Sequence, residues 1–334
     1  MLTHALLVAV VALQAPPPGL DSLLRQGLGF AERDVAQVVA GGVVTRTLDR
    51  ASGEEVPLVG VTRVRLSARA FVERFRRVET FLPRRELVQV GRFGTPPTAG
   101  DLAPFRVPAA DREPLRTCRP GKCVLKLPAA VTGRLQAIDW NAPGADSAAA
   151  DAWRGWLLDY ARGYVARGNA ALVVYDDAQR PLPLHTGFHE LLAESAPLLA
   201  GAPGFHHYLD EFPSAPRPAG GVEDVLYWST EDAGLRPVTG LTHASVLRTP
   251  PPAAGPGALI ALKQIYASHY FHAALTVIAL VDDPRSPGDP GAYVVYVERS
   301  LFDTPLGGLL RRRVEGRLRG GLQSRLEAMR RDLR

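Results

Sequence analysis

The end of the chain constrains the fold more than any other part, because it orders long apolar segments before one long arginine-rich helix. Ala258–Asp283 is too apolar for a loop, and its 26 residues would span about 85 Å if fully extended, too far for one strand. We therefore predict a bend or turn near Ser268–Tyr270. Ala292–Arg299 is typical of another strand, and Leu306–Leu333 of a helix. This order predicts a curved sheet closed by a C-terminal helix, with a cavity between them.

The predicted helix has two different faces. Placed at 100° per residue, its apolar side chains fall within an arc of roughly 160°; they are Leu310, Val314, Leu318, Leu322, Leu326, Met329 and Leu333. Arg311 and Arg325 lie on the apolar side and must snorkel to water or find partners. Gly321 also lies there, where it lets another element or a ligand come close. The helix either covers the sheet with a solvated basic back or meets a membrane or another anionic surface.

The positive charge of the chain is concentrated in this helix. Residues 311–334 hold nine arginines against three acidic residues, while the whole chain has a formal charge of +5. The rest of the chain is therefore close to neutral. We expect no nucleic-acid partner, because a nucleic-acid-binding surface needs a broader basic balance.

Residues 1–18 resemble a secretory leader. The apolar run Ala5–Leu13 is too short to span a bilayer but fits the hydrophobic region of a signal peptide. A basic stretch before it is missing, and the residues around Ala15 are unfavourable for cleavage, so an ordinary N-terminal helix or a lipid-facing anchor stays open, as do the true start and cleavage site. We expect a periplasmic or secreted protein whose residues 19–334 form a single domain.

The two cysteines agree with export. Cys118 and Cys123 bracket the turn signal Pro120-Gly121, and the flanking residues favour a hairpin over Leu115–Leu127. A disulfide across this hairpin would persist in an oxidising compartment. Free thiols or a redox pair are alternatives, although a redox pair usually has two intervening residues. A metal site lacks a second cysteine pair.

The remaining chain contains further strands and an insertion. Val43–Leu66 is typical of two strands, and Ser67 is a good N-cap for a helix over Ala68–Phe81. Residues from about 132 to 218 are helical in pattern and separate two sheet-forming parts. The fold class we predict is therefore α+β, a curved antiparallel sheet gripping a long C-terminal helix, with a helical insertion in the middle of the chain.

These elements, followed by AlaAlaLeuThrValIleAlaLeuValAspAsp, AlaTyrValValTyrValGluArg and the C-terminal helix, resemble the START-like, or helix-grip, superfamily. That superfamily includes polyketide cyclase-like and lipid-transfer proteins. The resemblance covers more than half of the chain, and its best local match is Ala273–Leu333. It implies an apolar cavity between sheet and helix that binds a small molecule or lipid. It brings no catalytic residues, because the superfamily has no common catalytic motif.

Sequence motifs of common enzymes are absent. The sequence contains no GxSxG, Walker A, HExxH or complete GxGxxG pattern, and we expect no cofactor. His185 and His189 have the spacing of two metal ligands on one helix face. Pro181, Pro183 and Gly187 suggest that His185 still lies in a loop, so we expect no metal site.

Polar and aromatic side chains supply candidates for a ligand site. His269, Tyr270 and His272 would alternate between the two faces of an extended strand, so one set would face the cavity. The other candidates are Tyr266, His243, Trp153 and Trp156. Each also has a structural interpretation, as a buried polar group with a partner or as a core aromatic.

Three functions follow from these observations. The first is an exported START-like protein that binds an apolar small molecule or lipid in an internal cavity without chemistry. The second is an enzyme of the same fold, cyclase-like or hydrolase-like, in which His269 or His272 acts as general acid/base. The third is an interaction protein that contacts an anionic surface through its arginine-rich C-terminal helix, which charge reversal of Arg312, Arg313 and Arg317 would test.

Overall fold

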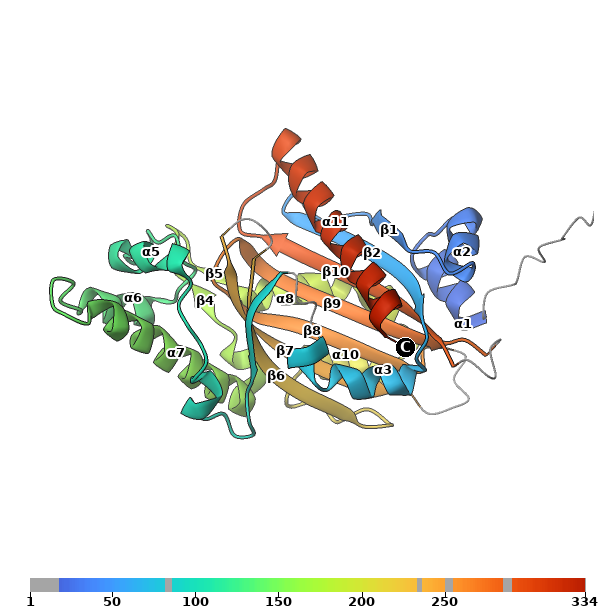
Figure 1. Ribbon diagram of the computed structural model, residues 1–334, viewed down its shortest axis with the longest axis horizontal. Helices are drawn as coiled ribbons and strands as arrows, with labels where there is room; N and C mark the ends of the chain where they lie inside the picture. Colours follow the sequence, from blue (N-terminus) through green and yellow to red (C-terminus); the bar gives the residue numbers. More distant parts are fainter. Residues whose placement is uncertain (1–17, 82–85, 233–235, 250–254, 285–289, 334) are drawn as a thin grey trace, which may run out of the picture.

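The predicted α+β fold class is confirmed in a computed structural model that describes residues 18–81, 86–232, 236–249, 255–284 and 290–333 (Figure 1). One open, curved antiparallel sheet has the strand order β1-β2-β10-β9-β8-β7-β6-β3. Its strands are β1 Val44–Thr47, β2 Glu55–Val64, β3 Leu87–Arg92, β6 Val222–Glu231, β7 Val238–Arg248, β8 Ala258–Ala267, β9 Phe271–Asp282 and β10 Ala292–Phe302. A separate hairpin pairs β4 Val174–Tyr175 with β5 Leu182–Pro183.

Helices cover both faces of this sheet. The helices, including 3-10 (η2–η4) and π (η1) segments, are α1 Pro18–Asp21, η1 Ser22–Gly27, α2 Glu32–Val39, α3 Ala68–Phe75, α4 Val78–Phe81, η2 Ala99–Leu102, η3 Ala109–Asp111, α5 Arg112–Thr117, α6 Ala129–Gln136, α7 Ala145–Arg167, η4 Gly168–Ala171, α8 Leu184–Glu194, α9 Ala196–Leu199, α10 Pro203–Asp210 and α11 Gly308–Asp332. In Figure 1, α3 and α11 lie in front of the sheet and α8 and α10 behind it. Buried residues form one cluster on the α3–α11 side and another on the insertion side. Because both faces are buried, the central strands are almost continuously apolar.

The strands end where special backbone conformations allow a turn. β8 ends at Ala267 and β9 begins at Phe271, which confirms the predicted turn at Ser268–Tyr270. Tyr270 has a φ of 63°, a left-handed conformation that ends the extended run. His269 and Tyr270 are therefore turn residues, and the prediction that they alternate along an extended strand was wrong.

The C-terminal helix packs through its second half. Leu322, Leu326 and Met329 are buried against the sheet, whereas Leu310 is 56% exposed. The predicted apolar face was therefore wrong at Leu310, because the N-terminal end of α11 projects beyond the sheet (Figure 1). Close approach depends on Gly60 of β2, where a Cβ would lie 2.3 Å from Leu326 Cδ1.

Arg311, predicted to need partners on the apolar side, is buried and satisfied. Its guanidinium donates to the backbone oxygens of Leu306 and Glu55, at 2.9 and 3.0 Å, and to the Glu315 carboxylate at 3.0 Å. These bonds tie the start of α11 to β2. Helix position is therefore set at two points, by Arg311 and by the leucines opposite Gly60.

The insertion lies in the middle of the chain as predicted, but its helical part starts earlier. α5 begins at Arg112 and α10 ends at Asp210, against a predicted span of about 132–218. Figure 1 shows α5, α6 and α7 at one end of the sheet. The insertion thus supplies the layer that covers the sheet face opposite α11.

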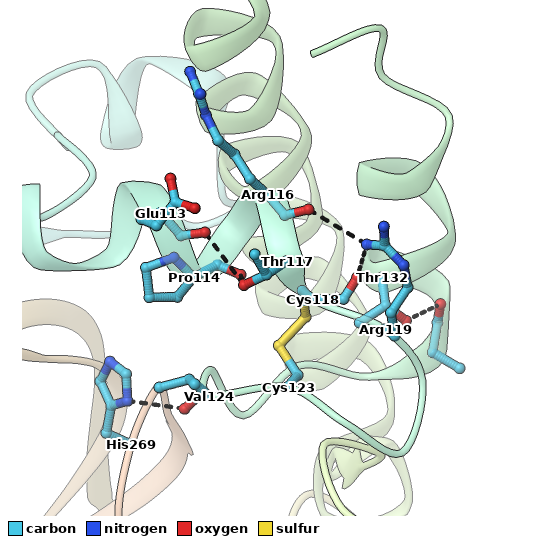
Figure 2. The surroundings of a disulfide bond; sticks show 11 residues. Glu113, Pro114, Arg116, Thr117, Cys118, Arg119, Cys123, Val124, Thr132 and His269 are labelled. Carbon is cyan, nitrogen blue, oxygen red and sulfur yellow. Dashed lines mark hydrogen bonds between the residues drawn. A yellow bond between two sulfur atoms is a disulfide. The ribbon is translucent and has the colours of Figure 1, made fainter.

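A disulfide joins Cys118 and Cys123, but the predicted hairpin around it was wrong (Figure 2). The residues before Cys118 form helix α5, and a single bridge pairs Arg119 with Lys122. The loop finds its hydrogen-bond partners elsewhere. Gly121 N and Cys123 N each donate over 2.9 Å to backbone oxygens of Asp176 and Asp177, so no partner strand is needed.

Removing the disulfide should lower the free energy of unfolding modestly. For a loop with a sequence separation of 5, chain entropy accounts for about 2 kcal/mol. We expect the variant Cys118→Ser/Cys123→Ser to lose about this amount in chemical denaturation of the oxidised protein. Reductant should destabilise the native protein alone, and equal stabilities of the two proteins without reductant would contradict the prediction.

Candidate functional site

A cavity of about 200 Å³ lies between the α11 side of the sheet and the helices that cover it. Alternate residues of β6, β7, β8, β9 and β10 face it, as the period of two in a strand requires. The polar and charged residues that these strands contribute form the polar floor of the cavity; they are Tyr227, Ser229, Glu231, Thr242, Gln264, Thr276, Tyr296, Glu298 and Ser300. Phe75 and Phe81 close it from α3 and α4. The cavity therefore combines aromatic walls with a polar floor.

Arg325 of α11 reaches into this floor. Its Nη1 donates to the Tyr296 hydroxyl at 2.7 Å and lies 3.7 Å from a Glu298 carboxylate oxygen. Its Nη2 lies 3.8 Å from Glu86. Interaction with Tyr296, and then with the carboxylates, raises the pKa of Arg325, so the guanidinium stays charged. The predicted need of Arg325 for a partner is thus met inside the cavity.

Burial shifts the pKa values of two neighbours on β10. It raises the pKa of the Glu298 carboxyl, and Arg325 offsets part of this effect. Burial also raises the pKa of the Tyr296 hydroxyl, although the nearby Arg325 guanidinium acts to lower it. The Glu298 side chain is 22% exposed, and the exposed part borders the cavity. A carboxyl with a raised pKa in an enclosed space can accept or donate a proton or bind a positive charge.

A groove of about 800 Å³ adjoins the cavity and opens to the surface. It runs between α3–α4 and the C-terminal half of α11, and both spaces are lined by Phe81, Glu86, Arg325 and Met329. Arg74, Arg77 and Arg331 also line the groove and are not among the described residues that line the cavity. A ligand could therefore reach the polar floor from the surface along this path.

None of the seven predicted site residues is among the described residues that line this cavity. Tyr266 explains one part of this result. In β8 the register shifts, so that Tyr266 pairs with Leu241 and Gln264 with Thr242, which leaves Ile265 extra. This bulge sends Tyr266 into the buried cluster on the insertion side, although Gln264, two residues earlier, faces the cavity.

His269, Tyr270 and His272 tie the β8–β9 turn to its surroundings. His269 Nε2 lies 2.9 Å from the buried Asp111 carboxylate, and its Nδ1 hydrogen-bonds the Val124 oxygen beside the disulfide (Figure 2). The Tyr270 hydroxyl accepts from the backbone of Arg236. His272 Nε2 hydrogen-bonds the Pro183 oxygen at 2.8 Å, and burial lowers its pKa.

Trp153 and Trp156 lie in the aromatic core between α7 and the sheet. Trp156 stacks on Tyr160 at 5.3 Å and meets the Tyr266 ring edge-on at 4.9 Å. Trp153 packs edge-on against Phe105 at 5.6 Å. These rings hold the insertion against the sheet.

His243 belongs to a buried polar network on the same side. Its Nε2 lies 3.0 Å from Asp224 and its Nδ1 2.9 Å from the Tyr164 hydroxyl. Tyr208 also donates to Asp224, at 2.6 Å. Burial lowers the pKa of His243. Burial by itself raises the pKa of Asp224. The hydrogen bonds that the carboxylate receives from His243, Tyr208 and Ser245 together outweigh burial, so the pKa is lowered and the carboxylate stays charged.

Lys263 lies buried beside this network. Its ammonium bonds Asn169 Oδ1 and lies over the rings of Phe188, Tyr164 and Phe212, 4.5 to 5.4 Å from their centroids. Burial lowers its pKa to about 7. Lys263 faces the insertion, on the opposite side of the sheet from the cavity.

His185 and His189 both lie on α8, so the prediction that His185 is a loop residue was wrong. Their Nε2 atoms are 2.8 Å apart, and His189 Nδ1 lies 2.7 Å from Asp210. Within the described residues, no group of three or more metal-ligating side chains is found.

The polar floor was missed because its residues are distributed over five strands whose other residues are mostly apolar. One signal was present: Tyr296, Glu298 and Ser300 recur at every second position of β10, which places them on one face. On the same face, Thr276 of β9 lies opposite Glu298, and Gln264 of β8 lies opposite Ala274.

Comparison with known proteins adds nothing to this geometry: no protein-family model matches the chain, and no curated protein matches it significantly. Across the described residues, no helix is both long and apolar enough to cross a membrane.

Proposed function

We propose that this protein is an exported START-like protein that binds a small apolar or amphipathic molecule in the cavity between α11 and the sheet, without chemistry. The observation that carries this proposal is the cavity itself, joined to the surface by the groove beside α11. The strand order and the helix lying across the curved sheet support the START-like class. The disulfide is compatible with export.

The volume of the cavity limits the size of the ligand. Pockets for drug-sized ligands measure about 300–1,000 Å³, and the cavity measures about 200 Å³. A small molecule therefore fits better than a whole lipid, although part of a longer ligand could lie in the groove. The alternative of an enzyme that uses His269 or His272 as general acid/base is less well supported. His269 hydrogen-bonds the Val124 oxygen and His272 the Pro183 oxygen, and neither is among the described residues that line the cavity. Contact with an anionic surface through the exposed Arg312, Arg313 and Arg317 is compatible with ligand binding.

Native mass spectrometry of the purified protein tests the proposal. We expect a co-purified small molecule that organic extraction removes. Ala274 faces the cavity from β9, so Ala274→Phe should fill it and abolish that mass difference. Ala148→Phe, at an exposed position of α7, should leave it unchanged. The proposal fails if the native protein carries no ligand and also binds no apolar probe after extraction.

A further inference from the structure

The charges that line the cavity do not balance. Among the described residues, three carboxylates, Glu86, Glu231 and Glu298, face it together with a single guanidinium, that of Arg325. Burial and repulsion by Glu231 and Glu86 raise the pKa of Glu298, and Arg325 offsets only part of this effect. An incoming positive charge would relieve this repulsion.

Two acceptors that line the cavity, Glu298 and Gln264, are poorly supplied with hydrogen-bond donors by the described residues. Arg325 Nη1 lies 3.7 Å from a Glu298 carboxylate oxygen, which is too far for a hydrogen bond. Gln264 Oε1 is buried and has no hydrogen-bond partner among the residues that the structure describes. A buried unpaired polar group costs about 1–3 kcal/mol. A ligand that brings donors would therefore gain more here than one that brings acceptors.

The walls suit a cation with an apolar body. Five aromatic residues, from α3, α4, β6, β9 and β10, line the cavity; they are Phe75, Phe81, Tyr227, Phe271 and Tyr296. The face of an aromatic ring attracts a cation, and its area covers apolar surface. Aromatic rings around carboxylates form an environment that fits an ammonium group on a hydrocarbon.

We propose that the cavity selects an apolar small molecule that carries a protonated amine, an inference that rests on the proposed ligand-binding function. The ammonium donates to Glu298 and Gln264, and the hydrocarbon packs on the aromatic walls. Arg325 Nε is buried with no hydrogen-bond partner in the described part of the chain, and this N–H is a potential donor to an anion. An anionic ligand, however, would add a fourth negative charge to three carboxylates, and Arg325 would offset only one of them.

Calorimetric titration with octylamine, octanol and octanoate tests this selection, because the three probes each have eight carbons and differ chiefly in the polar group. At pH 7 we expect octylamine to bind at least about tenfold more tightly than octanol, and octanoate to bind least. Glu298→Gln should remove most of the preference for octylamine, because it should lower the affinity for octylamine far more than the affinity for octanol. Glu231→Gln should reduce the preference in the same direction, and Glu113→Gln on the exposed face of α5 should not change it.

The outcomes separate this inference from the proposed function. Equal binding of the three probes, or tightest binding of octanoate, overturns amine selection while the cavity still binds a ligand. An octylamine preference that survives both Glu298→Gln and Glu231→Gln also overturns it. If no probe binds and no ligand co-purifies, both the inference and the proposed function fail.

Discussion

Replacing Lys263 with methionine should stabilise the protein below pH 7 by about 2–4 kcal/mol. Burial lowers the pKa of this lysine to about 7, from an ordinary value of 10.5. Each unit of difference corresponds to about 1.36 kcal/mol, so keeping the buried amine charged costs up to about 5 kcal/mol. Methionine removes this cost. It also leaves Asn169 Oδ1 without its hydrogen bond from Lys263, which destabilises the protein by about 1–3 kcal/mol.

The sign of the pH dependence follows from the depressed pKa. Below pH 7 both folded and unfolded lysine are protonated, and the full penalty is present. Between pH 7 and about 10.5 the unfolded chain holds the extra proton, so the stability of the native protein rises with pH. The advantage of Lys263→Met should therefore shrink through this window and disappear, or reverse, near pH 10.5.

Urea denaturation at pH 6, 8 and 10 measures this difference directly. Lys122→Met is the matched control, because Lys122 is exposed, and we expect it to change stability by less than about 0.5 kcal/mol at each pH. A destabilisation by Lys263→Met that is the same at pH 6 and pH 10 would show that the folded protein tolerates the charged amine.

The C-terminal architecture could be predicted because several independent signals agree there. The length of Ala258–Asp283 requires a turn, and the structure has it where Tyr270 adopts a positive φ. The spacing of Leu322, Leu326 and Met329 gives the face of α11 that packs on the sheet. Leu310 has the same spacing. Whether its side chain is buried depends on how far the sheet extends beneath the helix, and the helical periodicity of the sequence gives no information about that.

The cavity residues could not be predicted in the same way. Helices cover both faces of the sheet, so apolar residues occupy both faces of β8, β9 and β10 and the alternation is weak. The bulge at Ile265 then moves Tyr266 to the other face from Gln264. Histidine is a frequent catalytic residue, which favoured His269 and His272 as predictions. Glu298 and Gln264 lie in one site only because their strands present them on the sheet face that α11 covers.

The second large effect should come from Gly168, at the end of α7. Its φ of 55° and ψ of −129° lie in a region that only glycine adopts readily. A Cβ there would lie 2.0 Å from the backbone oxygen of Phe212, which accepts a hydrogen bond from Asn169 N. Gly168→Ala should therefore cost at least about 3 kcal/mol, since backbone strain adds to a clash that no side-chain rotation relieves.

Gly155 provides the matched control, because it lies within the same helix and a Cβ there meets nothing within 4 Å. Gly155→Ala should stabilise the protein by up to about 1 kcal/mol, the usual gain of alanine over glycine in a helix. The same substitution is thus expected to act with opposite signs at two positions of one segment. Chemical denaturation of both variants decides this, and a Gly168→Ala variant as stable as the native protein would contradict the left-handed turn.

Because Asn169 binds Lys263 and the backbone oxygen of Leu209, loss of this turn should also loosen α10 from the sheet, which faster hydrogen exchange of α10 amides would reveal.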